Sequence, residues 1–302
     1  MDSSARLLWW DIDGALAQER SADLMDNPRF ADAVRALASN MMAAGAGDKK
    51  LDGIFKDAGR YVAAMLAIHL HTSGGLTLPR LKELCKAFGF LSPGRARAML
   101  IYLQYLGYVE LIGSGTPARY APTARFVTAW RSHLRAALEA VRLIESSVGL
   151  VLERLQEADT LESLACAHTE CLLGWAGDGG QDAPFMRVFT HRYAGTQIIW
   201  SLILADQSDF PPSKPIRFSV AAAARQFSVS RMHIKRILAD GEREGLLRSG
   251  ANGTLILDEP ARDFIRYFYA MQLIALLIAT AKTARAWSEP AREFGPSQMA
   301  VP

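Results

Sequence analysis

The chain has little cysteine and little excess charge of either sign. Its 302 residues include three cysteines, an odd number that argues against a disulfide framework and is typical of a reducing cytoplasm. The net charge of +3 is too small for bulk electrostatics to indicate a nucleic-acid partner. Any polyanion would therefore have to meet a local basic patch.

Long apolar runs that would export or anchor the chain are also lacking. The start, MDSSARLLWWDIDGA, has only four consecutive apolar residues before an acidic one, which is unlike a signal peptide. The most apolar segment, residues 267–281, is shorter than the roughly 20 residues that a bilayer span needs. We expect a buried helix there, and a cytoplasmic protein with no membrane partner.

Strict alternation of apolar and polar residues is rare, whereas helical spacing of apolar residues recurs along the chain. Half of the residues are hydrophobic, so a chain of this length can bury a substantial core and form roughly two domains. These features predict a mainly α protein in which β structure is limited to small hairpins.

An internal repeat divides the chain in two. Residues 138 positions apart match at Ser92 and Ser230, Leu100 and Leu238, Gly107 and Gly245, Pro122 and Pro260, and Phe126 and Phe264. In both copies a helix, a turn, a second helix, a short strand, a glycine-containing tip, another strand and a long helix are expected in this order. The repeat predicts an N-terminal domain over 1–140 and a C-terminal domain over 141–302.

The second copy has the clearer pattern, FSVSRMHIKRILADGEREGLL at 227–247. Ser219 and Ser230 are each placed to cap a helix, with a short turn at 228–230 between the two helices. Gly245 can end the second helix at no steric cost, and two short strands around 249–253 predict a β-hairpin. These are the elements of a helix-turn-helix followed by a wing.

Helix, turn, helix and hairpin in this order resemble a winged helix-turn-helix domain, and the details are similar to MarR-type transcriptional regulators. The resemblance implies that the second helix enters the major groove of DNA and that the wing touches the backbone or minor groove. In that family, long flanking helices pair two subunits. Helices around 124–156 and 260–287 occupy those positions, which implies a covalently linked pseudo-dimer, and a further homodimer is possible.

The candidate DNA-binding residues differ between the copies. Helical spacing places the basic outward face of the second copy opposite a buried stripe of Ile234, Ile237 and Leu238. The corresponding face of the first copy carries Gly94 and Ala98, so an asymmetric duplex site is expected. The candidate residues are Ser230, Arg231, Met232, His233, Lys235, Arg236 and Arg248 in the second copy, and Arg95, Arg97 and Arg119 in the first.

The resemblance also implies a small-molecule effector between the two halves, because effector sites of the family lie between the dimer helices and the DNA-binding lobe. The tryptophans are candidate lining residues for such a pocket, with plain core packing as the alternative. They are Trp9, Trp10, Trp130, Trp175, Trp200 and Trp287.

Two motifs that could indicate an enzyme or a metal protein are weak. In CAHTEC, residues 166–171, the spacing of Cys166, His168 and Cys171 sends them in three directions on a helix, so core cysteines and a surface histidine are expected. The Asp11-x-Asp13-Gly start resembles haloacid dehalogenase phosphatases, but Ala15 replaces their threonine and no α/β pattern follows. We expect helix capping there, no metal, no cofactor and no catalytic residue.

The leading hypothesis is a non-enzymatic transcription regulator that binds duplex DNA through two winged helices. Two alternatives remain open. One is a protein-interaction scaffold for chromosome organisation or assembly, since winged helices also bind proteins. The other is a plasmid-type replication initiator, which also uses tandem winged helices.

Overall fold

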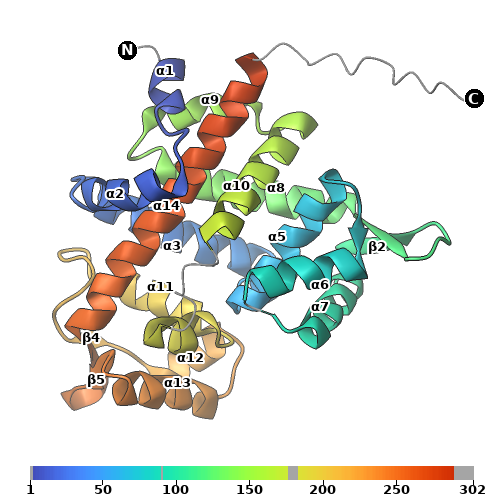
Figure 1. The fold of residues 1–302 in the computed structure, drawn as a ribbon. Coiled ribbons are helices and arrows are strands. Elements are labelled where there is room, and N and C mark those ends of the chain that lie inside the picture. The colour runs from blue at the N-terminus through green and yellow to red at the C-terminus, as the bar shows by residue number, and fades with distance from the viewer. Residues whose placement is uncertain (1–2, 90, 176–182, 289–302) are drawn as a thin grey trace, which may run out of the picture.

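A computed structural model describes residues 3–89, 91–175 and 183–288. The described chain is mainly helical, with two small antiparallel sheets of three strands each (Figure 1). The prediction of a mainly α protein with small β elements is therefore confirmed.

The two halves repeat one order of elements, from a long helix through a helix, a strand, two helices and a hairpin to a second long helix. The first half contains α1 (Ser3–Leu8), α2 (Gly14–Met25), α3 (Phe30–Gly47), α4 (Lys49–Ile54), α5 (Ala58–Thr72), β1 (Leu76–Thr77), α6 (Leu78–Ala87), α7 (Pro93–Tyr105), β2 (Val109–Ile112), β3 (Arg119–Pro122), α8 (Ala124–Val141), η1 (Ser146–Val148) and α9 (Gly149–Arg154). The second contains α10 (Ala158–Trp175), the π-helical segment η3 (Met186–Thr190), α11 (Gly195–Ala205), β4 (Ile216–Arg217), α12 (Val220–Gln226), α13 (Arg231–Arg243), β5 (Leu247–Ser249), η4 (Ala251–Gly253), β6 (Thr254–Leu257) and α14 (Glu259–Ser288). We call residues 58–141 module one and residues 195–288 module two.

The two sheets have the same topology. Their strand orders are β1-β3-β2 and β4-β6-β5. The hairpins pair Leu111 with Tyr120 and Arg248 with Ile256. The extra strands β1 and β4 pair with β3 and β6, respectively, on the side opposite the hairpin partner. The sequence pattern did not predict β1 and β4, because a two-residue strand has no periodicity.

Local sequence signals account for where α7 and α13, the second helices of the two equivalent helix pairs, begin and end. The hydroxyl of Ser92 accepts a hydrogen bond from the backbone N–H of Arg95, and that of Ser230 accepts one from His233. Gly107 and Gly245, which follow the two second helices, have φ angles of 71° and 67°, in the left-handed region that favours glycine. The repeated serines and glycines thus begin and end equivalent helices.

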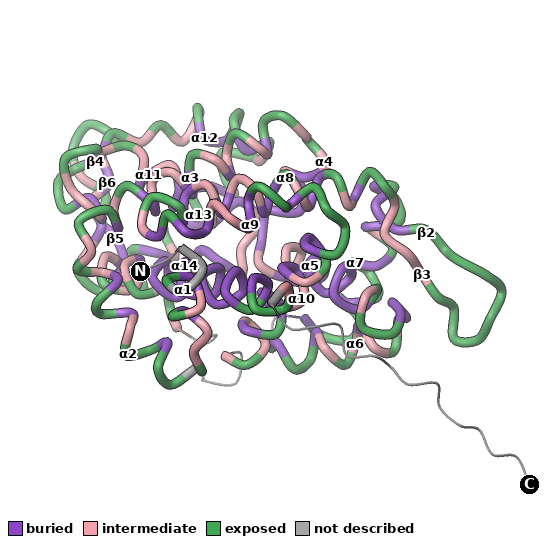
Figure 2. The backbone as a smooth tube through the Cα atoms, turned by 90° about the horizontal axis from the view of Figure 1, so that it is seen from above, coloured by how far each residue is buried: buried purple, intermediate pink, exposed green. Residues whose placement is uncertain are grey.

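The halves pack reciprocally around α14. Helix α8 packs against α3 and α14 against α10 within their own halves, while α11 packs against α3 and α5 against α10 across the halves. Figure 2 shows buried backbone concentrated along α14 and its neighbours, whereas the β2–β3 hairpin is exposed. One continuous hydrophobic core therefore joins the two halves.

Helix α14 is long and apolar enough over Glu259–Trp287 to cross a membrane, but 72% of its most apolar window is buried inside the protein. The length argument made from residues 267–281 was wrong, because the helix extends beyond both ends of that segment. The prediction of a buried helix is confirmed. Ile274, Leu277 and Ala281 are fully inaccessible to solvent.

Candidate functional site

The exposed face of α13 begins with a cluster of cations. Ile234, Ile237 and Leu238 are buried, as the apolar spacing predicts, so the helix turns Arg231, Lys235 and Arg236 outward. None of these three side chains forms an ion pair with any residue that the structure describes. Met232, with 57% of its surface exposed, lies among them. This part of α13 is free to meet an anionic partner.

At the C-terminal end of α13 the basic side chains form ion pairs within the protein. Asp240 pairs with both Arg192 and Arg243, and Arg187 donates to Glu244 at 3.0 Å. Arg243 is exposed on the same helix, but its guanidinium is paired with the Asp240 carboxylate. The unpaired positive charge is therefore confined to the first half of the helix.

Two predicted site residues, His233 and Ser230, form hydrogen bonds within the protein. The Nε2 atom of His233 lies 2.6 Å from the backbone carbonyl oxygen of Tyr193, so its ring turns inward and not toward the exposed face. The Ser230 hydroxyl is occupied as the helix cap. Unlike Lys235 and Arg236, neither side chain is exposed without an internal hydrogen bond.

The two hairpins contribute few free cations. Arg248 contacts the Asp258 carboxylate at 2.6 Å, and Arg119 folds back to donate to the carbonyl of Gly74 at 3.3 Å. Elsewhere in module two, however, Arg217 on β4 and Arg225 on α12 are exposed and have no ion pair within the described chain. Sequence reasoning missed Arg217 because a two-residue strand has no periodicity, and it missed Arg225 because only the second helix of the pair was considered as a binding surface.

The corresponding helix of module one, α7, has a mixed exposed face. Arg95 and Arg97 are exposed and without an ion pair to a described residue, as the repeat predicts. Further along the same helix Ile101 is 55% and Tyr105 83% exposed. Leu111 and Ile112 on β2 are also exposed large hydrophobic residues. Module one thus presents two arginines and an apolar surface.

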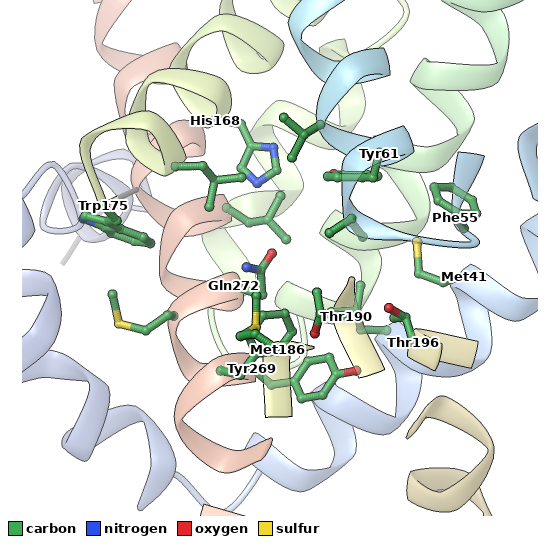
Figure 3. Close-up of a pocket in the computed structure, with 18 of the residues that line it drawn as sticks. Met41, Phe55, Tyr61, His168, Trp175, Met186, Thr190, Thr196, Tyr269 and Gln272 are labelled. Carbon is green, nitrogen blue, oxygen red and sulfur yellow. The ribbon is translucent and has the colours of Figure 1, made fainter. Parts of the chain in front are cut away.

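A cavity of about 330 Å³ lies between the halves (Figure 3). Its wall comes from α3, α5 and α8 of the first half and from α10, α11 and α14 of the second. Aromatic and aliphatic side chains form most of it, with His168 and Gln272 pointing into the same space from different helices (Figure 3). The aromatic residues of the wall are Phe55, Tyr61, Phe88, Trp175, Trp200, Phe264, Tyr267, Phe268 and Tyr269.

Two buried histidines, one from each half, line this cavity. His133 on α8 is 4% exposed and His168 on α10 is 3% exposed. Burial, with a smaller contribution from His168, lowers the pKa of His133 to about 3, and burial lowers the pKa of His168 to about 4. Both imidazoles are therefore neutral at pH 7, and each offers one donor and one acceptor.

The hydrogen bonds of these rings are incomplete. The Nε2 atom of His133 lies 3.0 Å from the Tyr61 hydroxyl, but its Nδ1 atom has no hydrogen-bond partner among the described residues. The Nε2 atom of His168 is buried without a partner as well. The prediction of a surface histidine at position 168 was wrong, because α10 is covered on this side by α5 and α14.

Two of the six tryptophans line the cavity and the others lie elsewhere. Trp175 and Trp200 line the cavity, while Trp130 is buried against Tyr61 and His133. Outside the cavity, Trp9 is half exposed beneath the Arg20 guanidinium, and Trp10 is buried beside it. Trp287 stacks with Arg154.

The two weak motifs have structural roles. Cys166 shares a hydrogen bond of 2.8 Å with the Thr72 hydroxyl and Cys171 is buried; neither makes a cluster with His168 that could hold a metal ion in the described part of the chain. Asp13 caps α2 by accepting from the backbone N–H of Leu16, which confirms the capping prediction, and Asp11 pairs with Arg285.

A buried lysine connects the halves beside the cavity. Lys56, 2% exposed, pairs with Asp52 at 2.8 Å and donates to the side chain of Gln197 at 3.1 Å and to the carbonyl of Phe227 at 2.7 Å. Phe227 ends α12 immediately before the turn into α13. Sequence reasoning could not find this contact, because a lysine side chain is ordinarily exposed.

Comparison of the chain with protein-family models, curated proteins and solved structures finds no match.

Proposed function

We propose that the protein is a cytoplasmic, non-enzymatic transcription regulator that binds duplex DNA through two winged helix-turn-helix modules fused in one chain. The observation that carries this proposal is the exposed, unpaired cluster of Arg231, Lys235 and Arg236 at the start of α13. The N-terminal part of the second helix is the part of a helix-turn-helix that reaches base edges in the major groove.

The repeated order of elements supports the proposal. Each module has a helix, a strand, two helices joined by a turn, a hairpin and a long helix, with one sheet topology. The reciprocal packing of the two halves through α3, α10, α8 and α14 is what a covalent pseudo-dimer requires. The same element order and sheet topology in both modules support the proposal that each module is a winged helix.

The proposed DNA site is asymmetric. Module two offers Arg231, Lys235 and Arg236 on α13 together with Arg217 on β4 and Arg225 on α12. Module one offers Arg95 and Arg97 on a helix face that is otherwise apolar or bare. Because few phosphates are neutralised per module, we expect a modest salt dependence of the affinity and a dominant contribution from module two.

The test is a selection of bound duplexes from a random pool with the full chain, followed by anisotropy titrations on the selected sequence. Arg236→Ala should weaken binding by about 1–3 kcal/mol and relax specificity if the side chain reads a base. Arg243→Ala is the matched control, because this arginine lies on the same helix but its charge is held by Asp240. Absence of duplex binding at low salt would overturn the proposal.

A second candidate function is a protein-interaction scaffold, which the exposed apolar surface of Ile101, Tyr105, Leu111 and Ile112 favours. A photo-reactive amino acid at position 105 tests it by cross-linking in cells, with the exposed position of Lys86 as control. Protein adducts specific to position 105, together with no duplex binding, would favour the scaffold over the DNA-binding regulator.

A further inference from the structure

The two helices that carry the exposed cations, α7 and α13, lie at the same end of the molecule, opposite α1 (Figure 1). Helix α7 packs on α5 and α6, and α13 packs on α12 and η3. Each of these contacts stays within one half of the chain, so none of them sets the distance between α7 and α13. That distance depends on contacts that cross from one half to the other.

Arg60, near the start of α5, makes such a crossing contact. Its guanidinium carbon lies 4.7 Å from the ring centre of Tyr102 on α7 and 4.7 Å from that of Tyr193 in the second half. The same group pairs with the buried Asp57 carboxylate at 3.3 Å and donates to the carbonyl of Gly53 at 3.2 Å. Because a planar guanidinium can stack on aromatic rings and form an ion pair at the same time, these contacts hold Arg60 from several sides.

Tyr193 continues the contact to α13. Its backbone carbonyl oxygen lies 2.6 Å from Nε2 of His233, and the two rings lie edge to face with their centres 6.4 Å apart. A single series of contacts, through Arg60 and Tyr193, therefore runs from α7 to α13.

A second series of contacts lies next to it along the chain. Lys56 donates to the Gln197 side chain and to the carbonyl of Phe227, and its own backbone carbonyl accepts from the N–H of Ala194 at 2.6 Å. Asp52 pairs with the Lys56 ammonium and accepts from the amide of Gln197 at 2.6 Å. The Lys56 and Gln197 side chains are buried. The two halves thus meet here through directional bonds between polar groups.

The repeat contains the first part of this arrangement twice. Arg192 lies shortly before α11, as Arg60 lies at the start of α5, and it pairs with Asp240 on α13. Asp240 follows Tyr102 by 138 positions, which is the offset of the repeat. Equivalent arginines therefore contact the same position of the two second helices, and Arg60 extends its contact to Tyr193 in the other half.

We propose that residues 52–60 and 193–197 form an inter-half joint, with Arg60 as its positioning residue, that holds α7 and α13 at one separation. Ion pairs and hydrogen bonds depend steeply on distance and angle, so a movement of one half against the other would break several of them at once. The consequence for DNA rests on the proposed function: the protein selects duplexes in which the two contacted segments have one fixed spacing.

The separation can be measured without DNA, by pulsed electron–electron double resonance between two spin labels on the full chain. The labels are attached through a non-canonical amino acid at the exposed positions of Ala98 on α7 and Ala239 on α13. We expect one narrow distance distribution, and one at least twice as wide in Arg60→Met, which can neither stack nor pair. Tyr193→Leu should widen the distribution as well, because it removes a stacked ring while it keeps the backbone carbonyl that contacts His233.

Arg154→Met is the matched control. Arg154 also pairs with an acidic residue three positions away, Glu157, and lies 4.1 Å from the ring centre of Trp287, but it is outside the joint. Its variant should keep the narrow distribution. Circular dichroism checks that each variant is folded. Unchanged widths in Arg60→Met and Tyr193→Leu would refute the joint.

The consequence for DNA is measured by anisotropy on a selected duplex whose two contacted segments have been located by footprinting. Insertion of two base pairs between the segments turns one relative to the other by about 70° and moves it by about 7 Å. The insertion should weaken binding at least tenfold in the wild type and in Arg154→Met, but less than threefold in Arg60→Met. Because each ratio compares two duplexes with one protein, a general loss of affinity from the missing charge cancels.

Two results would refute the link between the joint and DNA. One is an insertion effect in Arg60→Met as large as that in the wild type, and the other is the absence of an insertion effect in the wild type. If no duplex binds at all, the proposed function fails, and the spin-label distances still decide whether the joint holds the two helices.

Discussion

Acid should destabilise this protein through the two cavity histidines, and substitution of His168 should remove part of that effect. In the folded chain burial lowers the pKa of His133 to about 3 and that of His168 to about 4. In the unfolded chain both return to about 6.5. Between these values the unfolded state binds more protons, so stability is present above the unfolded pKa and is lost as the pH falls toward the folded pKa.

The size of the loss follows from proton linkage. Between pH 7 and pH 5 an unfolded histidine becomes almost fully protonated while the buried ring stays neutral. Each histidine then lowers the free energy of unfolding by about 2 kcal/mol, or about 4 kcal/mol for the pair. His168→Phe should therefore lose about 2 kcal/mol less than the wild type over this interval. At pH 7 it should be at least as stable, because an unpaired buried nitrogen is gone.

Urea denaturation followed by circular dichroism at the two pH values measures this difference directly. Leu164→Met, another buried position of α10, is the control. It should lower stability by a similar amount at both pH values, because it removes no titratable group. A pH-dependent loss in His168→Phe that equals the wild-type loss would refute the assignment of a buried neutral imidazole.

Substitutions at three further positions probe other contacts. Gly195→Ala should destabilise by about 3 kcal/mol or more in urea denaturation, because its new Cβ would lie 2.0 Å from the backbone oxygen of Phe189. Lys56→Met should cost about 2–4 kcal/mol in the same assay, since it leaves Asp52 and a buried carbonyl without their cation. Ser230→Ala should cost about 1 kcal/mol of stability through loss of the cap, whereas Ser230→Asp keeps the cap but should weaken DNA binding by its negative charge.

Each of these substitutions has a control variant or a result that would contradict the expectation. Gly174→Ala lies in open space near the end of α10 and should be neutral or slightly stabilising. A Lys56→Met variant as stable as the wild type would show that the buried ammonium contributes nothing net to the contact between the halves. DNA affinity that is unchanged in Ser230→Asp would place this helix start away from phosphate.

Periodicity and capping in the sequence determined the local structure of α7 and α13, the second helices of the two repeated helix pairs. Ser92, Ser230, Gly107 and Gly245 begin and end their helices through contacts within a few residues, so their roles could be read without knowing the rest of the fold. The buried stripe of α13 and its exposed cations follow from a spacing that any helix imposes. The internal repeat then predicted the same order of elements in both halves.

Tertiary structure alone decided which of those side chains are free and what the halves enclose. Arg248 and His233 look like exposed groups of a basic face, yet each has a partner brought close by the fold. His133 and His168 are separated by 35 positions and become one pair only because α8 and α10 both line the space beside α14. Charge pairing and enclosure depend on distances between elements, and a linear spacing does not contain those distances.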